Sequence, residues 1–318
     1  MRTLITGGAG FIGSAVADAY LADGHDVAVV DDLSAGDTAN LDPRVRLYRV
    51  DVTAGGVEAV FEAERPELVN HHAAHVSVRR SVEDPQRDAT VNVLGAINVL
   101  EAARKHGARR VIFASTGGAI YGEQDGPPAD ERHPCRPRSP YAVAKLAVEY
   151  YLDYYRATYG LDAIVLRYAN VYGPRQNPHG EAGVIAAIME RLRAGVTPTI
   201  FGDGEQVRDY VYVADVVRAN LAALHADPCA DETAIINVGT GVGTTVNRLW
   251  ALIAATASVT TPPAYAPARA GDVRRSVLDA SRAKRALAWE PEIDLAEGIR
   301  RTWAWFAAAR HRANRSSR

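Results

Sequence analysis

Cysteine and long apolar runs are scarce in this sequence. Of the 318 residues only two are cysteines, Cys135 and Cys229, and neither has a second thiol at the spacing of a metal site. A disulfide framework is therefore excluded, and the usage fits a reducing compartment. No stretch of about 18 apolar residues indicates a membrane span, and the first expected strand begins at once, which leaves no room for a secretory signal. We expect a cytoplasmic protein without a membrane partner.

An excess of charge of either sign is also missing. The formal net charge is −2, so no basic field is available to attract nucleic acid or an anionic lipid surface. An anionic ligand would have to be held by individual arginines. The hydrophobic content of 47% is enough to bury a full core, in one large domain or two coupled ones.

Glycine is concentrated near the start of the chain. A short apolar strand over 4–6 is followed by Gly7, Gly10 and Gly13, and an alanine-rich segment over 14–21 has helical spacing. Strand, tight turn and helix in this order let the backbone approach a pyrophosphate, which the free N–H groups of the helix N-terminus can bind. The pattern predicts a dinucleotide site.

Two acids support this interpretation. A second strand, Asp26–Val30, ends in Asp31 and Asp32, about 20 residues after the glycine turn, where an acid binds the ribose hydroxyls in the dinucleotide fold. A carboxylate at this position repels a 2′-phosphate. We therefore expect NAD as the cofactor and not NADP.

Strands and helices alternate over the first half of the chain, which predicts an α/β fold with a doubly wound parallel sheet of the Rossmann type. The expected strands cover 45–50, 68–72, 111–114 and 163–167, and the expected helices cover 57–64, 89–106 and 141–160. The alternation weakens after Gly173, but a buried strand over 234–239 is expected to return to the main sheet. We predict an NAD-binding domain over 1–170 rejoined by about 211–240, a smaller substrate domain over 171–210 and 241–308, and a frayed tail over 309–318.

Three histidines and one acid at the ends of expected strands leave alternatives open. His71, His72 and His75 lack a further ligand at metal spacing, so packing or cofactor-lining roles are favoured and no metal is expected. Asp51 follows the third strand, where it could accept from an adenine amino group or cap the next turn.

Tyr141 and Lys145 lie one helical turn apart, after the N-terminal signal Ser139-Pro140. A phenol titrates about three pH units too high for a base at pH 7, a gap of roughly 4 kcal/mol. An ammonium about 4 Å away contributes about that much at an effective dielectric near 20. Thr116, at the end of a strand, offers a hydroxyl to the same pocket. We predict catalysis by these three residues, although a tyrosine and a lysine at this spacing also occur by chance on solvated helix faces.

Six motifs are linked along the chain: Thr6-Gly-Gly-Ala-Gly-Phe-Ile-Gly13, Asp31-Asp32-Leu33, Ser115-Thr116, Tyr141-Ala-Val-Ala-Lys145, Asn170-Val-Tyr-Gly-Pro-Arg175 and Gly202-Asp-Gly-Glu-Gln-Val-Arg208-Asp209-Tyr210. Together they resemble those of the extended short-chain dehydrogenase/reductase family of NAD-dependent epimerases and dehydratases, and most of all its UDP-glucose 4-epimerases. The resemblance covers nearly the whole chain except the tail.

The resemblance implies that Tyr141 takes the proton of a sugar 4-hydroxyl while hydride leaves C4 for NAD, and that hydride then returns to the opposite face of the 4-keto sugar. The implied cofactor contacts are Gly7, Gly10, Phe11, Ile12, Gly13, Asp31, Asp32, Asp51, Val52, Ala73, Ala74, Asn92, Tyr141, Lys145 and Tyr168. The implied contacts with a UDP-sugar are Thr116, Tyr141, Asn170, Phe201, Arg208, Arg269, Asp272 and Ser276, with Arg175 as a further candidate. Arginines among glycines and prolines also suit a pyrophosphate on their own chemistry, whereas Phe201 could stack beside uracil or belong to the core.

Departures from the family pattern bear on the substrate. Ser276 stands where many glucose/galactose enzymes have a tyrosine, which would widen the pocket for N-acetyl sugars, and Arg175 could instead face a glucuronate carboxylate. Gly117-Gly118 replaces the Asp-Glu pair that a 4,6-dehydratase of the family requires. A catalytically silent NAD-binding sensor or scaffold has no need of Tyr141 and Lys145.

The resemblance also implies a homodimer formed through two long helices of each subunit. The candidates are the segments 89–106 and 141–159, whose apolar stripes would equally serve the internal core.

Overall fold

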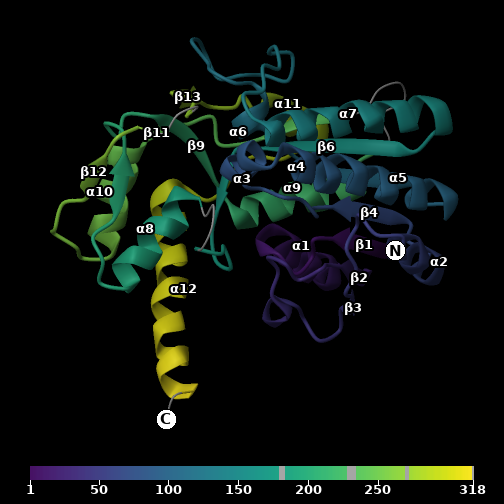
Figure 1. Ribbon diagram of the computed structural model, residues 1–318, viewed down its shortest axis with the longest axis horizontal. Helices are drawn as coiled ribbons and strands as arrows, with labels where there is room; N and C mark the ends of the chain where they lie inside the picture. Colours follow the sequence, from purple (N-terminus) through teal and green to yellow (C-terminus); the bar gives the residue numbers. More distant parts are fainter. Residues whose placement is uncertain (179–182, 228–233, 269–271, 317–318) are drawn as a thin grey trace.

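A seven-stranded sheet forms the centre of the protein (Figure 1). The computed structural model describes residues 1–178, 183–227, 234–268 and 272–316, the last eight of these by their backbone alone. All strand pairs in the sheet are parallel, and the order is β10-β6-β5-β4-β1-β2-β3. The strands are β1 (Arg2–Thr6), β2 (Asp26–Val30), β3 (Arg46–Tyr48), β4 (Leu68–His71), β5 (Arg110–Thr116), β6 (Asp162–Tyr168) and β10 (Ala234–Val238).

Helices cover both faces of this sheet. On one face lie α1 (Phe11–Ala22), α9 (Val213–His225) and α11 (Ser281–Leu287), and on the other lie α2 (Gly56–Glu64), α5 (Gly95–Lys105) and α7 (Pro140–Tyr159). Tyr20 and Val216 belong to the core on the first face, whereas Phe61, Val99 and Leu152 belong to the core on the second. The predicted doubly wound Rossmann sheet is confirmed.

The long helix expected over 89–106 is interrupted. It consists of α4 (Pro85–Ala89), a π-helical turn η2 (Thr90–Leu94) and α5, and the short α3 (Val78–Glu83) precedes it. Asn92 lies inside this π-helical turn, and its side chain forms hydrogen bonds with the backbone of His75. Two further short helices, η1 (Thr38–Asn40) and α6 (Gly117–Ile120), follow β2 and β5.

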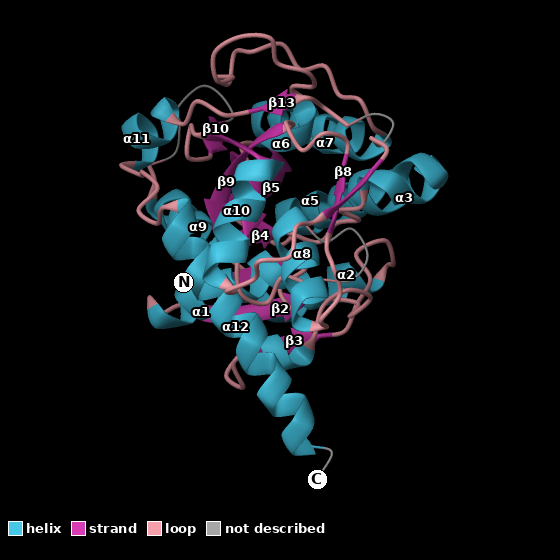
Figure 2. Cartoon of the chain, turned by 90° about the vertical axis from the view of Figure 1, so that its left-hand side faces the viewer, coloured by secondary structure: helices cyan, strands magenta, loops and turns pink. Residues whose placement is uncertain are grey.

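A smaller, mostly C-terminal part has its own sheet and core. Its strands are β7 (Asn170–Tyr172), β9 (Val207–Tyr212), β11 (Gly243–Thr245) and β13 (Arg275–Ser276), with β8 (Thr199–Phe201) paired to β12 (Ala264–Ala266). Its helices are α8 (Val184–Arg193), α10 (Val246–Thr256) and α12 (Leu295–Ser316). Figure 2 looks onto this side, with α8, α10 and α12 in front of the main sheet.

The chain passes from the larger part to the smaller one and back. As predicted, the strand over 234–238 returns to the main sheet, where β10 pairs with β6. The end of the chain differs from the prediction, because the backbone of α12 is helical as far as Ser316 and not frayed from residue 309. Among the described residues no helix combines the length and the apolar character needed to cross a membrane.

The strand order reverses between β1 and β4, so the connections that follow these two strands diverge at the carboxyl edge of the sheet. In open α/β sheets this is the point where ligands bind. The predicted glycine turn, the segment that contains Ala73 and the end of β5 at Thr116 all lie on this edge.

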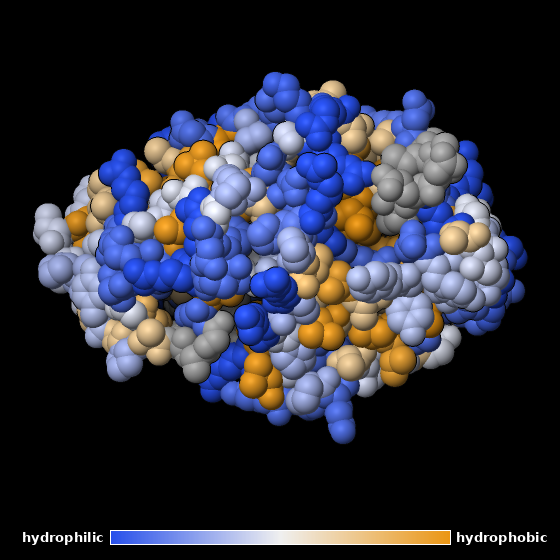
Figure 3. Space-filling view, turned by 90° about the horizontal axis from the view of Figure 1, so that it is seen from above, coloured by the Kyte–Doolittle hydropathy of each residue, from blue (hydrophilic) through white to orange (hydrophobic). Residues whose placement is uncertain are grey.

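On the face seen in Figure 3, hydrophobic patches lie among hydrophilic residues.

Candidate active site

The glycine turn after β1 is packed so closely that side chains would not fit. Gly7 has a φ of +67°, and a Cβ built on it would lie 2.6 Å from the Ala73 nitrogen. A Cβ on Gly13 would lie 2.3 Å from the carbonyl oxygen of Gly7. Helix α1 starts at Phe11 with Gly10 as its N-cap, and no side chain caps it. Its first N–H groups therefore suit an anion, and the turn fits a dinucleotide pyrophosphate.

The acids after β2 are bonded to nearby backbone. Asp31 is buried and accepts hydrogen bonds from Ala9 N at 2.9 Å and Leu33 N at 2.8 Å, while burial raises the pKa of its carboxyl group. Asp32 is exposed and accepts from the Ser34 backbone and hydroxyl. Asp31 thus fixes the geometry of the turn in addition to the predicted role toward ribose.

The other predicted cofactor residues lie around the same edge, and several are held by protein contacts. Asp51 accepts from the Thr53 N–H and hydroxyl, both at 2.8 Å, so the capping alternative describes its contacts. Val52 is buried against the second face of the sheet. Ile12 packs on the first core cluster, and Ala74 follows Ala73 at half-buried positions.

Asn92 and Tyr168, both predicted to contact the cofactor, also make hydrogen bonds to the protein. The Asn92 amide accepts from His75 N at 2.8 Å and donates to His75 O at 2.9 Å, so it clamps backbone and does not present a free amide. Tyr168 is buried, and its hydroxyl accepts from Asn220 Nδ2 at 2.9 Å. Its ring stacks near His72, with centroids 6.3 Å apart.

His71, the last residue of β4, and His72, which follows it, are neutral groups packed inside the protein. His71 Nδ1 lies 2.6 Å from the Thr6 hydroxyl, and its ring stacks on Phe113. Burial, together with the charge of Lys145, lowers the pKa of His71 and of His72 to about 3. These contacts match the packing interpretation of the histidine cluster.

The predicted catalytic residues come together at the end of β5. Thr116 ends this strand, and its hydroxyl lowers the pKa of the Tyr141 phenol in the first turn of α7. Helix α7 begins as the sequence predicts, because the Ser139 hydroxyl accepts from Ala142 N and Pro140 occupies the first turn. Thr116, Tyr141 and Lys145 therefore lie near one another at the carboxyl end of β5.

Lys145 contacts backbone and not the phenol. Its side chain is buried, Nζ donates to the Ala114 carbonyl at 2.9 Å, and the ammonium lies 4.7 Å from the Phe113 ring centroid. Burial lowers the pKa of Lys145 to about 8. Burial raises the pKa of Tyr141, Asp88 raises it further and the Thr116 hydroxyl lowers it. The ammonium is thus bonded to a carbonyl oxygen and not to the phenol, and the acidifying effect of Lys145 on Tyr141 stays a prediction.

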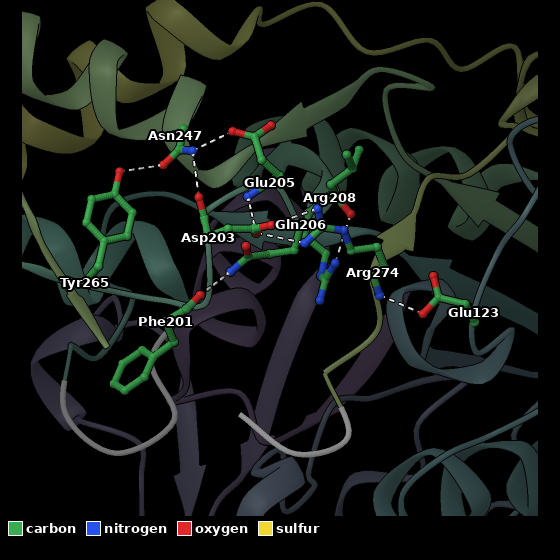
Figure 4. Close-up of polar contacts among 10 residues, drawn as sticks. Glu123, Phe201, Asp203, Glu205, Gln206, Arg208, Asn247, Tyr265 and Arg274 are labelled. Carbon is green, nitrogen blue, oxygen red and sulfur yellow. Dashed lines mark hydrogen bonds and ion pairs between the residues drawn. The ribbon is translucent and has the colours of Figure 1, made fainter. Parts of the chain in front are cut away.

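The smaller part supplies a network of polar side chains around β9 (Figure 4). Asp203 forms a two-bond ion pair with Arg274, at 2.8 and 3.0 Å, and Glu123 accepts from the Arg274 backbone N–H at 2.6 Å. Arg208 donates to the Val207 carbonyl at 2.9 Å, and burial lowers the pKa of its guanidinium. Most of this network was not predicted, although Asp203 and Glu205 belong to the glycine-rich loop noted in the sequence.

The predicted substrate residues Phe201 and Asp272 border this network. The Phe201 ring points away from the polar side chains in Figure 4, while its carbonyl accepts from Gln206 at 2.9 Å. Asp272 is exposed and acts on the charge of Arg208. Arg269 lies outside the described residues.

Ser276 and Asn170 approach the catalytic wall from the smaller part. Strand β13 pairs with β9 so that Ser276 lies opposite Arg208, and Ser276 is buried with Oγ 3.4 Å from the Gly118 carbonyl. A Cβ on Gly118 would lie 3.6 Å from Asn170 Oδ1 and 3.8 Å from the Thr116 hydroxyl.

Gly117 has no room for the acid of a dehydratase pair. A Cβ at this position would lie 2.5 Å from a methyl group of Leu278. This packing agrees with the argument from sequence against a 4,6-dehydratase.

Arg175 is directed elsewhere than predicted. It pairs with Asp18 at 2.8 Å and donates to the Ser14 hydroxyl at 3.2 Å, so it joins the loop after β7 to α1. Asp18 and Ser14 both belong to α1, the helix that follows the glycine turn. The Arg175 side chain therefore does not lie with Ser276 and Arg208. A role in reading a glucuronate carboxylate is not supported by these contacts.

One group that sequence analysis did not detect consists of Asp23, His25 and His225, which lie close enough in the described part of the chain to hold a metal ion. Asp23 Oδ2 lies 3.0 Å from His25 Nε2 and 2.7 Å from His225 Nε2. These residues join the end of α1 to the end of α9. Sequence analysis also did not detect Asp88. Its spacing of four from Asn92 is the only local signal for it.

Fold and site together define a dinucleotide-dependent enzyme with a Tyr-x-x-x-Lys pair. Residues 3–239 match the model of the NAD dependent epimerase/dehydratase family. The chain belongs to this family.

Three similar proteins at 47–48% identity have the same name. A UDP-glucose 4-epimerase from Mycolicibacterium smegmatis is 47% identical over 96% of this chain and 98% of its own length. The structure of a Thermotoga maritima UDP-glucose 4-epimerase with UDP-glucose has a TM-score of 0.94 at 48% identity and covers 97% of this chain and 99% of its own. A Thermus thermophilus UDP-glucose 4-epimerase complex with NAD has a TM-score of 0.92 at 47% identity, covering 97% and 100%.

Proposed function

We propose that this protein interconverts UDP-glucose and UDP-galactose by inverting C4 of the sugar, with NAD as a resident cofactor. The observation that carries the proposal is that Tyr141 and buried Lys145 lie on one helix beside the end of β5, where Lys145 bonds Ala114 and Thr116 acts on the phenol, at the carboxyl edge of a Rossmann sheet. The three relatives at 47–48% identity that match almost the full chain are named UDP-glucose 4-epimerases, and two of them are structures with UDP-glucose and with NAD.

The residues that would hold NAD follow from the packing of the glycine turn. Gly7, Gly10 and Gly13 would leave space for the pyrophosphate at the start of α1, and Asp31 with Asp32 would bind the adenosine ribose. When bound, oxidised NAD supplies the acceptor for the hydrogen that leaves C4 with its electron pair, and it returns that hydrogen later.

The protein's own residues would handle the proton of the 4-hydroxyl. Tyr141 accepts this proton at its phenolic oxygen and gives it back, while Thr116 keeps the phenol in position and bonds the sugar oxygen. Because burial raises the pKa of Tyr141, positive charge is required near the phenol for this step at neutral pH. Lys145 supplies such a charge from the same helix face.

The smaller part would bind the UDP group. Arg208 is a half-buried cation in the network of Figure 4 and suits the diphosphate. Asp272 acts on its charge, and Asn170 pairs with Tyr210 on the same strand β9. Phe201 would lie beside the base. We propose accordingly that 1–170 with about 211–240 forms the NAD-binding domain and that 171–210 with 241–308 forms the substrate domain.

The test is C4 inversion followed by NMR with purified protein and no added reductant. UDP-glucose should give a mixture with UDP-galactose, and Tyr141→Phe should abolish turnover while NAD stays bound. If wild-type protein that carries NAD leaves every UDP-hexose, UDP-N-acetylhexosamine and UDP-hexuronate unchanged, the protein is a silent NAD-binding sensor or scaffold.

A second substrate class is favoured by one observation. Ser276 is small and buried at the sugar end of the site, next to Gly118, so UDP-N-acetylglucosamine should also fit. In the same NMR assay a Ser276→Tyr variant should lose turnover of the N-acetyl sugar and retain that of UDP-glucose.

We also propose a homodimer formed through α5 and α7, in the cytoplasm. Helix α7 buries Leu152 and Tyr155 against its own sheet but exposes Tyr150 (71%) and Tyr154 (49%). It therefore has apolar surface both for the internal core and for contact with a second subunit. Light scattering should give twice the chain mass, and Tyr150→Glu should shift the mass toward that of one chain.

A further inference from the structure

Asp88 is a buried acid for which the mechanism above has no use. It lies in α4 with 1% of its surface exposed, and its Oδ2 atom has no hydrogen-bond partner among the described residues. A buried carboxylate that is only half satisfied is costly. It therefore differs from the solvated charges that cover most helices.

The other oxygen of Asp88 holds a side chain that fixes the cofactor edge. Oδ1 accepts from Asn92 Nδ2 at 2.9 Å, and Asn92 in turn binds both the N–H and the carbonyl of His75. The backbone just before His75 is the segment against which Gly7 packs, through Ala73. Asn92 lies in a π-helical turn, a feature often found at functional sites.

Helix α4 packs against α7, the helix that carries Tyr141 and Lys145. Two acids, Asp88 and Glu149, act on the buried Lys145 to keep it charged. Glu149 is neutralised by its ion pair with Arg167. Among the described residues Asp88 forms no such ion pair. Burial raises the pKa of its carboxyl group, and Asn92, His75 and Lys145 lower it.

We propose that Asp88 is a positioning residue of the active site, whose buried carboxylate balances the ammonium charge of Lys145 and, through Asn92, holds the segment at His75 in place. Without this negative charge the buried ammonium loses its proton more easily. Tyr141 lies in the field of the same carboxylate, which opposes its ionisation. Asp88 thus raises the pH up to which Lys145 keeps its proton and its positive charge.

The chain offers a direct measurement, since it contains only three lysines, Lys105, Lys145 and Lys284. Lys105 pairs with Glu58, and Lys284 pairs with Glu290, both at exposed positions. In protein labelled with ¹³C at lysine Cε, each residue gives one resonance that can be titrated by NMR.

Asp88→Asn should lower the pKa of Lys145 by about 1 unit relative to wild type, and the titrations of Lys105 and Lys284 should not move. The matched control is Glu83→Gln, which removes one carboxylate from the neighbouring helix α3, where Glu83 pairs with Arg79 in solvent. An unchanged Lys145 titration in Asp88→Asn, or an equal shift in Glu83→Gln, would overturn the inference. If Asp88→Asn does not fold, Asp88→Ser repeats the test with a smaller acceptor.

The kinetic consequence rests on the proposed function. The alkaline limb of kcat/KM for UDP-glucose should move to lower pH in Asp88→Asn by the shift seen for Lys145, and Glu83→Gln should keep the wild-type limb. Wild-type protein without turnover refutes the proposed function and leaves the NMR test intact. Active wild-type protein with an unmoved limb in Asp88→Asn refutes the role of Asp88.

Discussion

The buried ion pair behind the active site allows a quantitative prediction. Glu149 and Arg167 are each 3% exposed, and Arg167 Nε donates to both carboxylate oxygens at 3.0 and 3.2 Å. The Ser115 hydroxyl also donates to Glu149 at 2.6 Å, and Arg167 donates to the Tyr121 hydroxyl at 2.9 Å. Glu149→Gln leaves the guanidinium buried without a counter-charge, which should cost about 3–5 kcal/mol of unfolding free energy.

This cost converts to a melting temperature. An unfolding entropy of about 2.1 cal/mol/K per residue gives roughly 0.7 kcal/mol/K for this chain of 318 residues. Glu149→Gln should therefore lower Tm by about 4–7 °C in a calorimetric scan. Glu83→Gln is the exposed control, because Arg79 and Glu83 are 81% and 57% exposed, and it should change Tm by less than about 1 °C. Equal effects of the two variants would refute the reasoning.

Three further predictions concern cofactor, catalysis and pH. Gly13→Ala places a methyl group against the Gly7 carbonyl, so NAD affinity measured by calorimetry should fall by about tenfold or more; wild-type affinity would show that the turn can relax. Thr116→Val should reduce kcat by about 100-fold and Thr116→Ser by a few-fold, and equal rates would remove the hydroxyl from the mechanism. Because the His225 and His25 contacts lower the pKa of Asp23, its contribution to stability is present above about pH 4 and is lost as the pH falls through the lowered value. Asp23→Asn should make Tm less dependent on pH in the acid range, and an unchanged slope would contradict this.

Elements with strong local signals were predictable. The start of α7 follows from a serine cap and a proline in its first turn, and both act as expected. The strands were found because their buried apolar runs alternate with helical periodicity. The interruption of the helix over 89–106 was not predictable, since the bonds of Asn92 to His75 link positions 17 apart in sequence.

The site was only partly predictable for the same reason. A spacing of four puts Tyr141 and Lys145 on one helix face, but the partner of the ammonium is Ala114 on another strand. Arg175 lies in a loop rich in glycine and proline as a phosphate ligand would, yet it pairs with Asp18 on α1. Such partners come from packing that leaves no pattern along the chain.

The sequence by itself determined the glycine turn, the order of strands and helices and the residues available for proton transfer, because backbone conformation and periodic burial are local properties. Only the tertiary structure decided which charges meet. It placed Asp88 within the electrostatic reach of Lys145 and brought Ser276 opposite Arg208 through the register of β13 on β9. Electrostatic interactions in a buried site depend on distance and solvent exclusion, which exist only after the chain has packed.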